Sequence, residues 1–166
     1  MTYLSNFDYD SYSDAFILEI LNSVKSIAMV GASAKWNRPS NFAMKYLIQK
    51  GYNVIPINPN TDEKEIFGKR IFPDLKSVTE PVDMVDMFRP AAEAYYLVND
   101  SVEIGAKVFW MQLDIINIGA ANVAEKSGMR VVMNRCPKIE YARLFGELGW
   151  NGINTGVITN RRRRLR

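Results

Sequence analysis

The chain of 166 residues is long enough for one domain with its own hydrophobic core, and its composition, 48% hydrophobic and 23% charged, is ordinary for a globular protein. A single cysteine, Cys136, excludes an intramolecular disulfide and fits a reducing compartment. The N-terminal segment is polar and acidic rather than basic and then apolar, and no apolar run reaches the length of a membrane span. We therefore expect a cytoplasmic protein without a membrane-spanning helix.

The net charge of +3 comes from one end of the chain. Five of the 21 basic residues lie in the last six positions: Arg161, Arg162, Arg163, Arg164 and Arg166. We expect a single domain over residues 1–150 and a basic C-terminal tail over residues 151–166. A nucleic-acid-binding domain carries its basic residues on a folded face, so this distribution disfavours nucleic acid as a partner. We expect the tail to be a solvated, mobile extension, and the alternative is contact of its arginines with RNA, DNA or an acidic partner. Apolar residues in the tail suggest packing on the body or on a second copy in a homodimer.

In chain order, the first predicted element is an amphipathic helix over residues 14–24, with Ser13 as its cap. A short apolar run over residues 26–30 predicts a buried parallel strand that ends at Gly31. After a loop, residues 41–50 have a helical pattern, and a second strand follows over residues 53–57.

Residues 61–81 are the least regular stretch, and we expect one short helical turn there and an excursion through Gly68. The remaining pattern alternates strands with helices: strands over 82–88, 107–113 and 129–133, and helices over 91–104, 117–127 and from Pro137. This alternation predicts an α/β protein, a single domain with a Rossmann-like, doubly wound, parallel five-stranded sheet. The strand order 3-2-1-4-5 is the most economical, and its ligand crevice lies at the carboxyl ends beside the first strand.

The loop after the first strand carries groups that suit a phosphate. Gly31 allows a sharp turn and a close backbone approach, and the following helix offers unpaired N–H groups. Ser33 and Ser40 can donate hydrogen bonds, and Arg38 can bind two phosphate oxygens at once. These features favour phosphate binding over the alternative, a plain turn with a surface arginine.

The same loop lacks the GxGxxG fingerprint of dinucleotide-binding proteins, because only its first glycine is present. A dinucleotide site also needs an acidic residue after the second strand, where this chain has Asn58 and Pro59. An asparagine cannot offer a carboxylate's bonds to the ribose hydroxyls, so NAD is disfavoured.

Several short motifs match a known family in order and spacing. They are Gly31-Ala32-Ser33, Arg38-Pro39-Ser40, Gly51-Tyr52, Pro56-Ile57-Asn58-Pro59, Phe88-Arg89, Gly105-Ala106-Lys107, Trp110-Met111-Gln112 and Asn134-Arg135-Cys136-Pro137. Together they resemble the CoA-binding domain family, small proteins similar to the N-terminal domain of the succinyl-CoA synthetase alpha subunit, from about residue 14 to residue 147.

The resemblance implies a Rossmann-like fold with coenzyme A across the strand ends. The phosphates would lie at the loop that contains Gly31, Ala32, Ser33, Arg38 and Ser40. The adenosine would lie near Asn58 and Pro59, and the pantetheine arm would pass Phe88 and Arg89 toward Gln112. The chain departs from the family at Asp114, where a glycine is usual, and this places an acid near the strand end.

Three residues at the strand ends have alternative interpretations. Arg89 suits a phosphate or a pantetheine carbonyl, or it forms a salt bridge to Asp83 or Asp86. Trp110 and Gln112 alternate with Met111 and face one side of the sheet. We expect Trp110 to pack in the core and Gln112 to contact the ligand.

Cys136 and the lack of histidine bear on catalysis. A thiol at a helix N-terminus beside Arg135 would have a lowered pKa, which suggests a redox role, although a lone cysteine is more often a buried small residue. We expect Lys138 and Glu140 to be solvated. The chain has no histidine, whereas the succinyl-CoA synthetase alpha subunit works through a phosphorylated histidine in a later domain.

No catalytic motif is recognisable, so the sequence favours a binding module over an enzyme. The hypothesis is a protein that binds CoA or acyl-CoA in a non-catalytic or regulatory role, reporting to a protein partner. The alternative is an NAD(P)-dependent oxidoreductase or an acyl-CoA-handling enzyme that uses Cys136 or Asp114.

Overall fold

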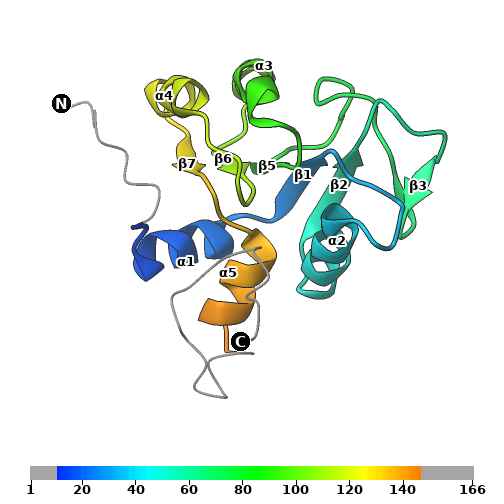
Figure 1. Cartoon of the computed structure of the whole chain (residues 1–166), viewed down its shortest axis with the longest axis horizontal. Helices are drawn as coiled ribbons and strands as arrows, with labels where there is room; N and C mark the ends of the chain where they lie inside the picture. Colours follow the sequence, from blue (N-terminus) through cyan, green and yellow to red (C-terminus); the bar gives the residue numbers. More distant parts are fainter. Residues whose placement is uncertain (1–10, 147–166) are drawn as a thin grey trace, which may run out of the picture.

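A five-stranded parallel sheet runs through the part of the chain that the computed structural model describes, residues 11–146 (Figure 1). Its strands are β1 (Ser26–Val30), β2 (Asn53–Ile57), β5 (Met84–Met87), β6 (Val108–Met111) and β7 (Arg130–Val132). All neighbouring strands of this sheet pair in parallel. This confirms the predicted Rossmann-like, doubly wound α/β fold. The predicted tail, residues 151–166, lies outside the described residues.

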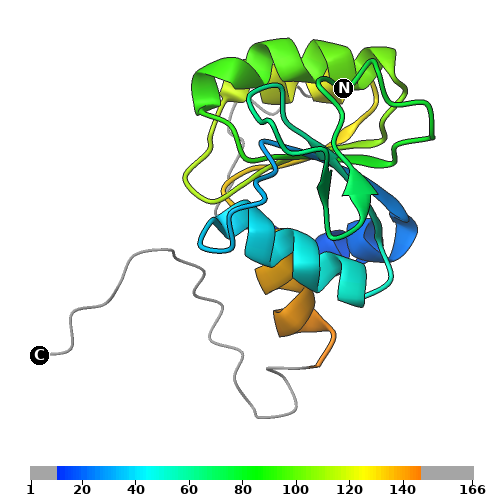
Figure 2. The same cartoon turned by 90° about the vertical axis from the view of Figure 1, so that its right-hand side faces the viewer.

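Helices cover both faces of the sheet (Figures 1 and 2). The helices are α1 (Asp14–Ser23), α2 (Pro39–Gln49), α3 (Ala94–Glu103) with a 3-10 turn before it (Ala91–Glu93), α4 (Ile118–Lys126) and α5 (Pro137–Leu144). Local sequence sets their starts: Ser13 Oγ accepts from the Phe16 N–H at 3.2 Å, and α2 and α5 begin with proline, which suits a first helical turn. The predicted helices are confirmed to within a few residues.

The core lies in two layers, because alternate residues of each strand point to opposite faces. On one face Ala28 and Val30 pack with residues of α3 and α4. On the other, Ile27 and Met29 pack with residues of α1 and α2. None of the helices in the described part of the chain is long and apolar enough to cross a membrane.

The strand order is β2-β1-β5-β6-β7, so the predicted order, with the third strand beside the second, is wrong. The free edge of β2 is occupied by Phe72, whose N–H donates to Pro56 O and whose carbonyl accepts from the Asn58 N–H, both at 2.9 Å. With that edge taken, β5 pairs with β1 instead.

The segment between β2 and β5 forms a small antiparallel ribbon at the edge of the molecule (Figure 1). Its two strands are β3 (Glu65–Ile66) and β4 (Lys69–Arg70), joined by a turn in which Phe67 and Gly68 have positive φ. The short helical turn predicted over residues 61–81 is therefore wrong.

Because the chain goes from β1 to β2 on one side and then to β5 on the other, the switch point lies between β1 and β5.

Candidate functional site

The loop after β1 is held tightly against the neighbouring strand ends. Gly31 has φ +89°, and a Cβ atom there would lie 2.8 Å from the carbonyl oxygen of Phe88. The N–H groups of Gly31 and Ala32 donate to Ile57 O at 2.9 and 3.2 Å. Only glycine fits this position without a clash, and the loop is fixed between the ends of β2 and β5.

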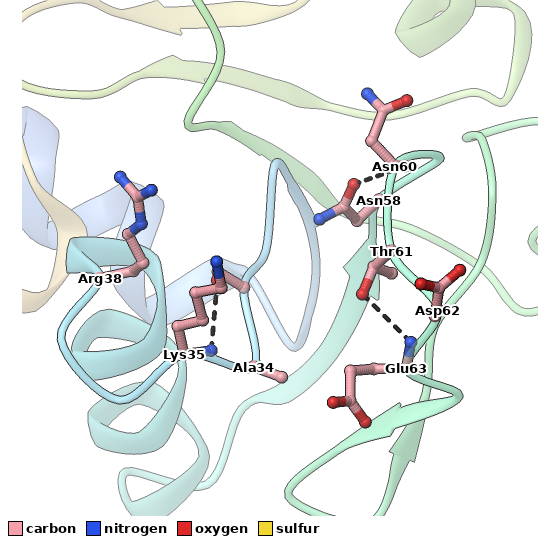
Figure 3. A pocket seen from close by; sticks show the side chains of 9 residues that line it. Ala34, Lys35, Arg38, Asn58, Asn60, Thr61, Asp62 and Glu63 are labelled. Carbon is pink, nitrogen blue, oxygen red and sulfur yellow. Dashed lines mark hydrogen bonds between the residues drawn. The ribbon is translucent and has the colours of Figure 1, made fainter.

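A polar hollow of about 480 Å³ lies between the loops that follow β1 and β2 (Figure 3). Its lining residues are Ser33, Ala34, Lys35, Arg38, Asn58, Asn60, Thr61, Asp62 and Glu63. Lys35 and Arg38 supply positive charge from the first loop, and Asp62 and Glu63 supply negative charge from the second. Arg38 is exposed, lines the hollow and directly precedes α2, whose first residue, Pro39, has no N–H group.

Asn58 bridges the two loops. Its Nδ2 donates to Ala32 O at 2.8 Å, and its Oδ1 accepts from the Asn60 N–H at 2.8 Å. The side chain thus holds one wall of the polar hollow against the other. Pro59 is exposed and is not among the lining residues.

Two of the predicted phosphate-loop residues lie below the surface. Ala32 is buried, and Ser40 is buried in the first turn of α2, so neither lines a hollow. Ser33 does line the polar hollow, and its Oγ accepts from the Lys35 N–H at 3.2 Å. The structure thus brings Ser33 and Arg38 together and leaves Ser40 in a packing role.

Asp62 and Glu63 were not among the predicted site residues. They lie within the irregular segment after β2, and only the path of that segment back along the edge of β2 brings them to the hollow. No local pattern in the sequence signals this placement.

A second, largely apolar hollow of about 520 Å³ lies between the ends of β5 and β6 and the starts of α2 and α5. Its lining residues are Pro39, Phe42, Ala43, Phe88, Arg89, Pro90, Gln112, Leu113, Ile115, Cys136, Lys138 and Ile139. Phe88, Arg89 and Gln112, three predicted site residues, meet here. Arg38 and Pro39 are adjacent in sequence, so the two hollows lie on either side of the start of α2.

Arg89 forms a bidentate ion pair with Glu93, through Nε at 2.9 Å and Nη2 at 2.7 Å. The predicted salt-bridge partners, Asp83 and Asp86, were therefore wrong. The pair is partly exposed beside the apolar hollow, and the hydrogen bonds from Arg89 to Glu93 raise the pKa of the guanidinium. Arg89 stays positively charged at the strand end.

Gln112 forms the best-buried polar contact of the site. Its Nε2 donates to both carboxyl oxygens of Asp86, at 2.8 and 3.1 Å. Asp86 is fully buried within β5. Burial raises its pKa to about 7, although the hydrogen bond from Gln112 lowers it in part. The strand predicted over residues 82–88 contains two carboxylates, Asp83 and Asp86, and only the structure shows that Asp86 is the buried one.

Trp110 and Cys136 are both buried. Trp110 has no exposed surface and donates from Nε1 to Arg135 O at 2.8 Å, which confirms its predicted core position. Cys136 caps α5, and burial raises the pKa of its thiol to about 11. The hypothesis of a lowered thiol pKa is therefore wrong, because desolvation outweighs the helix N-terminus.

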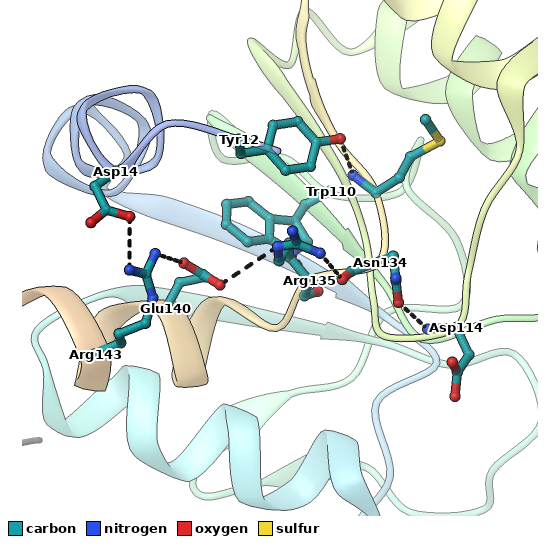
Figure 4. Close-up of polar contacts among 9 residues, drawn as sticks. Tyr12, Asp14, Trp110, Asp114, Asn134, Arg135, Glu140 and Arg143 are labelled. Carbon is teal, nitrogen blue, oxygen red and sulfur yellow. Dashed lines mark hydrogen bonds and ion pairs between the residues drawn. The ribbon is translucent and has the colours of Figure 1, made fainter. Parts of the chain in front are cut away.

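Glu140 is also buried, so the expectation that it is solvated was wrong (Figure 4). Its carboxylate lies 2.6 Å from Arg143 Nη2 and 3.8 Å from Arg135 Nε. Arg143 Nη1 in turn lies 2.7 Å from Asp14 Oδ1, so this network joins α5 to α1. Lys138 is half-buried, and its amine lies 5.6 Å from the centre of the Tyr46 ring.

Asp114 occupies a turn with φ +64°, and its N–H donates to Asn134 Oδ1 at 2.9 Å. Glycine adopts this conformation most easily and aspartate tolerates it, which explains why a glycine suits the position in the family. The Asp114 side chain is exposed and lines neither hollow. Within residues 11–146 no cluster of His, Cys, Asp or Glu could hold a metal ion.

The fold and the hollowed strand ends define a doubly wound α/β protein with a crevice at the switch point of its sheet. Within that class, the chain belongs to the CoA-binding domain family, whose model matches residues 25–142. This confirms the resemblance on which the sequence prediction relied.

The chain is similar to proteins of two different sizes. It is 35% identical over 130 residues to the uncharacterized protein YneT of Bacillus subtilis (strain 168), covering 78% of this chain and 95% of that protein. It is 31% identical over 133 residues to the alpha subunit of the ADP-forming acetate–CoA ligase I of Pyrococcus furiosus, where the match covers 78% of this chain and 27% of the subunit. A solved structure of a hypothetical protein from Pyrococcus horikoshii OT3 has a TM-score of 0.78 and 36% identity, covering 88% of this chain and 100% of that one.

Proposed function

We propose that this protein binds coenzyme A, or an acyl-CoA, at the carboxyl ends of β1, β2, β5 and β6. The observation that carries the proposal is the pairing of a charged hollow with an apolar one on either side of the start of α2. Coenzyme A has the same division, with a phosphorylated nucleotide at one end and a long, weakly polar arm at the other. Membership of the CoA-binding domain family supports this ligand.

In this proposal the phosphates lie beside Ser33 and Arg38, at the N-terminus of α2. No ion pair among the described residues engages the Arg38 side chain, so its guanidinium is available for a phosphate. The adenosine end lies in the polar hollow near Asn58, and the pantetheine arm follows the apolar hollow past Phe88 and Arg89 to Gln112.

We also propose a non-catalytic or regulatory role, in a cytoplasmic protein that reports CoA to a protein partner. The buried, protonated thiol of Cys136 is unsuited to nucleophilic attack at neutral pH, and Asp114 lies outside both hollows. These placements weigh against the two residues on which an acyl-CoA-handling enzyme would depend.

The second candidate is an NAD(P)-binding oxidoreductase, and one observation favours it. Asp62 and Glu63 bring carboxylates to the polar hollow, where they could accept hydrogen bonds from a ribose diol. The same charges would repel a 3′-phosphate, so they favour NAD over CoA in that part of the hollow.

Titration of CoA, NAD and NADP, each with the thermal midpoint and calorimetry as readouts, separates the candidates. A ligand at 100 times its Kd adds about 2.7 kcal/mol to the free energy of unfolding if it binds only the folded state. We expect stabilisation by CoA and none by NAD or NADP. Stabilisation by NAD alone would make the oxidoreductase the better assignment.

The assignment of Arg38 is tested by Arg38→Ala. Loss of a charge-assisted bond to phosphate should weaken CoA binding about tenfold or more. Lys45→Ala is the matched control, because it removes an exposed positive charge from the same helix without touching either hollow. Equal affinities in the two variants would reject Arg38 as a phosphate ligand.

A further inference from the structure

Asp86 lies beneath the apolar hollow. It is the one carboxylate within the five strands of the sheet, and it has no exposed surface. Its partner, Gln112, follows the adjacent strand β6 and lines the hollow while remaining 5% exposed. Gln112 therefore separates the buried carboxylate from the space above it.

The contact determines which way the Gln112 amide faces. An ionised carboxylate accepts hydrogen bonds and cannot satisfy a carbonyl oxygen, so with Asp86 ionised Nε2 points to it, as the distances of 2.8 and 3.1 Å record. No hydrogen bond between the described residues uses Gln112 Oε1. Two buried side-chain atoms of the described residues lack a hydrogen-bond partner, namely Glu140 Oε1 and Arg143 Nε. Gln112 Oε1 is not one of them, so it is not sealed inside the protein. Gln112 Oε1 is thus an accessible acceptor at the base of the hollow.

Apart from the Cys136 thiol, the other polar side chains around the hollow are cationic. Arg89 and Lys138 both line it, and each can only donate hydrogen bonds. The rest of the lining is largely apolar and would contact the methylene and methyl groups of a ligand. An uncharged acceptor in such a setting selects a ligand with an N–H group among apolar neighbours, and the amides of a pantetheine arm have this chemistry.

We propose that Asp86 is a positioning residue, which turns the Gln112 carbonyl oxygen toward the apolar hollow so that it accepts a hydrogen bond from a pantetheine amide N–H. This rests on the proposed function, since it takes the arm of CoA as the ligand of the hollow. Asp86 itself does not touch the ligand. Asp86 sets which end of the Gln112 amide faces the hollow. The site therefore presents a hydrogen-bond acceptor and binds a ligand group that donates.

The experiment compares two ligands by calorimetry: CoA and 3′-phosphoadenosine 5′-diphosphate, which has the nucleotide without the arm. The variants are Gln112→Met, Asp86→Leu, the double variant and Gln112→Glu. All proteins are compared above pH 7, where Asp86 of the unmodified protein is ionised. In Gln112→Glu the two facing buried carboxyls share one proton, so the acid donates to Asp86 and still presents a carbonyl oxygen to the hollow. Ser101→Ala, a buried polar change in α3, is the control for a general loss of stability.

We expect Gln112→Met and Asp86→Leu each to reduce the affinity for CoA roughly fivefold to tenfold. The double variant should bind CoA as well as either single variant. The nucleotide without the arm should bind all variants equally, and Gln112→Glu should keep its CoA affinity. A loss in Gln112→Glu equal to that in Gln112→Met would mean that Gln112 donates, and would overturn the proposal. Unchanged CoA binding in Gln112→Met would also overturn the proposal. This variant carries the test if Asp86→Leu does not fold.

Failure of the proposed function gives a different result. In that case the unmodified protein would not bind CoA at all, which would overturn both the function and this inference. CoA binding that is retained with no dependence on Gln112 or Asp86 would overturn the inference alone.

Discussion

At the scale of single residues, backbone conformation explains several features of the site. Gly31, Asp114 and Asn134 all have positive φ, and they lie in the loops that follow β1, β6 and β7. Glycine, aspartate and asparagine are the residues that tolerate this conformation best. The sharp turns that these residues make bring the loops after β1, β6 and β7 to the ligand side of the sheet.

The substitution Gly31→Ala tests the close approach of this loop to β5. A Cβ atom 2.8 Å from Phe88 O adds a backbone clash to the strain of positive φ, so we expect a loss of about 2 kcal/mol or more in the free energy of unfolding. Gly105→Ala is the control, because it also has positive φ but no atom within 4 Å of the added Cβ. Its loss should be about 1 kcal/mol. Equal losses in urea unfolding would contradict the clash.

Burial of Asp86 predicts a pH-dependent stability. Its pKa is raised from 3.8 to about 7 in the folded protein, so the folded state holds the proton more tightly than the unfolded state. The contribution of Asp86 to the free energy of unfolding is therefore fully present below the pKa that Asp86 has in the unfolded chain. It is lost as the pH rises through the folded-state pKa of about 7. Cys136 stays protonated throughout, since its pKa is about 11.

Urea unfolding of the protein and of Asp86→Asn across this pH range measures the effect. Relative to the variant, the free energy of unfolding of the unmodified protein should fall by up to about 1.4 kcal/mol per pH unit as the pH increases. Parallel pH profiles for the two proteins would show that Asp86 does not titrate in this range.

At the scale of elements, α5 depends on a buried network of charges rather than on a long apolar face. Glu140 joins Arg135 and Arg143, and Arg143 reaches Asp14 at the start of α1 (Figure 4). A tyrosine ring adds to the contact, since Tyr141 meets Tyr46 of α2 edge to face with ring centres 6.0 Å apart. The network thus anchors α5 beside α1, while the ring contact joins it to α2.

The substitution Glu140→Gln should destabilise the protein by about 3 kcal/mol, because it removes the buried carboxylate that pairs with Arg143 and Arg135 and leaves Arg143 paired with the exposed Asp14. Glu19→Gln is the control, as Glu19 pairs with Arg130 at 3.1 Å on the surface and should contribute less than about 1 kcal/mol. Chemical unfolding measures both, and a loss in Glu140→Gln no larger than in the control would reject the network as an anchor.

At the scale of the whole molecule, the path of the chain after β2 decides both the strand order and the shape of the site. Phe72 occupies the edge of β2, so the third long strand pairs with β1 and the switch point lies between β1 and β5. The same path brings Asp62 and Glu63 to the polar hollow. The edge segment carries little of the core, whereas β1 and β5 are buried along their full lengths.

Hydrogen exchange in the native state should therefore divide the molecule. The amides of β1 and β5 should exchange only on global unfolding, while those of the ribbon β3–β4 should exchange through local opening at a lower free energy. CoA should slow exchange in the loops after β1 and β2 more than in the ribbon. Ribbon amides as well protected as those of β5 would mean that this edge is part of the central folding unit.

Sequence patterns alone determined most of the elements and much of the candidate site. Apolar runs identified all five strands, because strands covered on both faces need continuous hydrophobic sequence. Local chemistry singled out the loop with Gly31 and Arg38, since its glycine and arginine suit a phosphate, and residues of this loop line the polar hollow. Arg89 and Gln112 were expected at one edge because they follow parallel strands, Phe88 was implied by the family resemblance, and all three line the apolar hollow.

The strand order, the partners of buried charges and the pKa of Cys136 were decided only by the tertiary structure. Each depends on residues far apart in the chain: Phe72 beside β2, Gln112 on Asp86, and Glu140 between two arginines. Periodicity reports which side of an element is buried, but it does not report which neighbour covers it. Desolvation depends on that neighbour, and for this reason a thiol at a helix N-terminus is protonated here rather than activated.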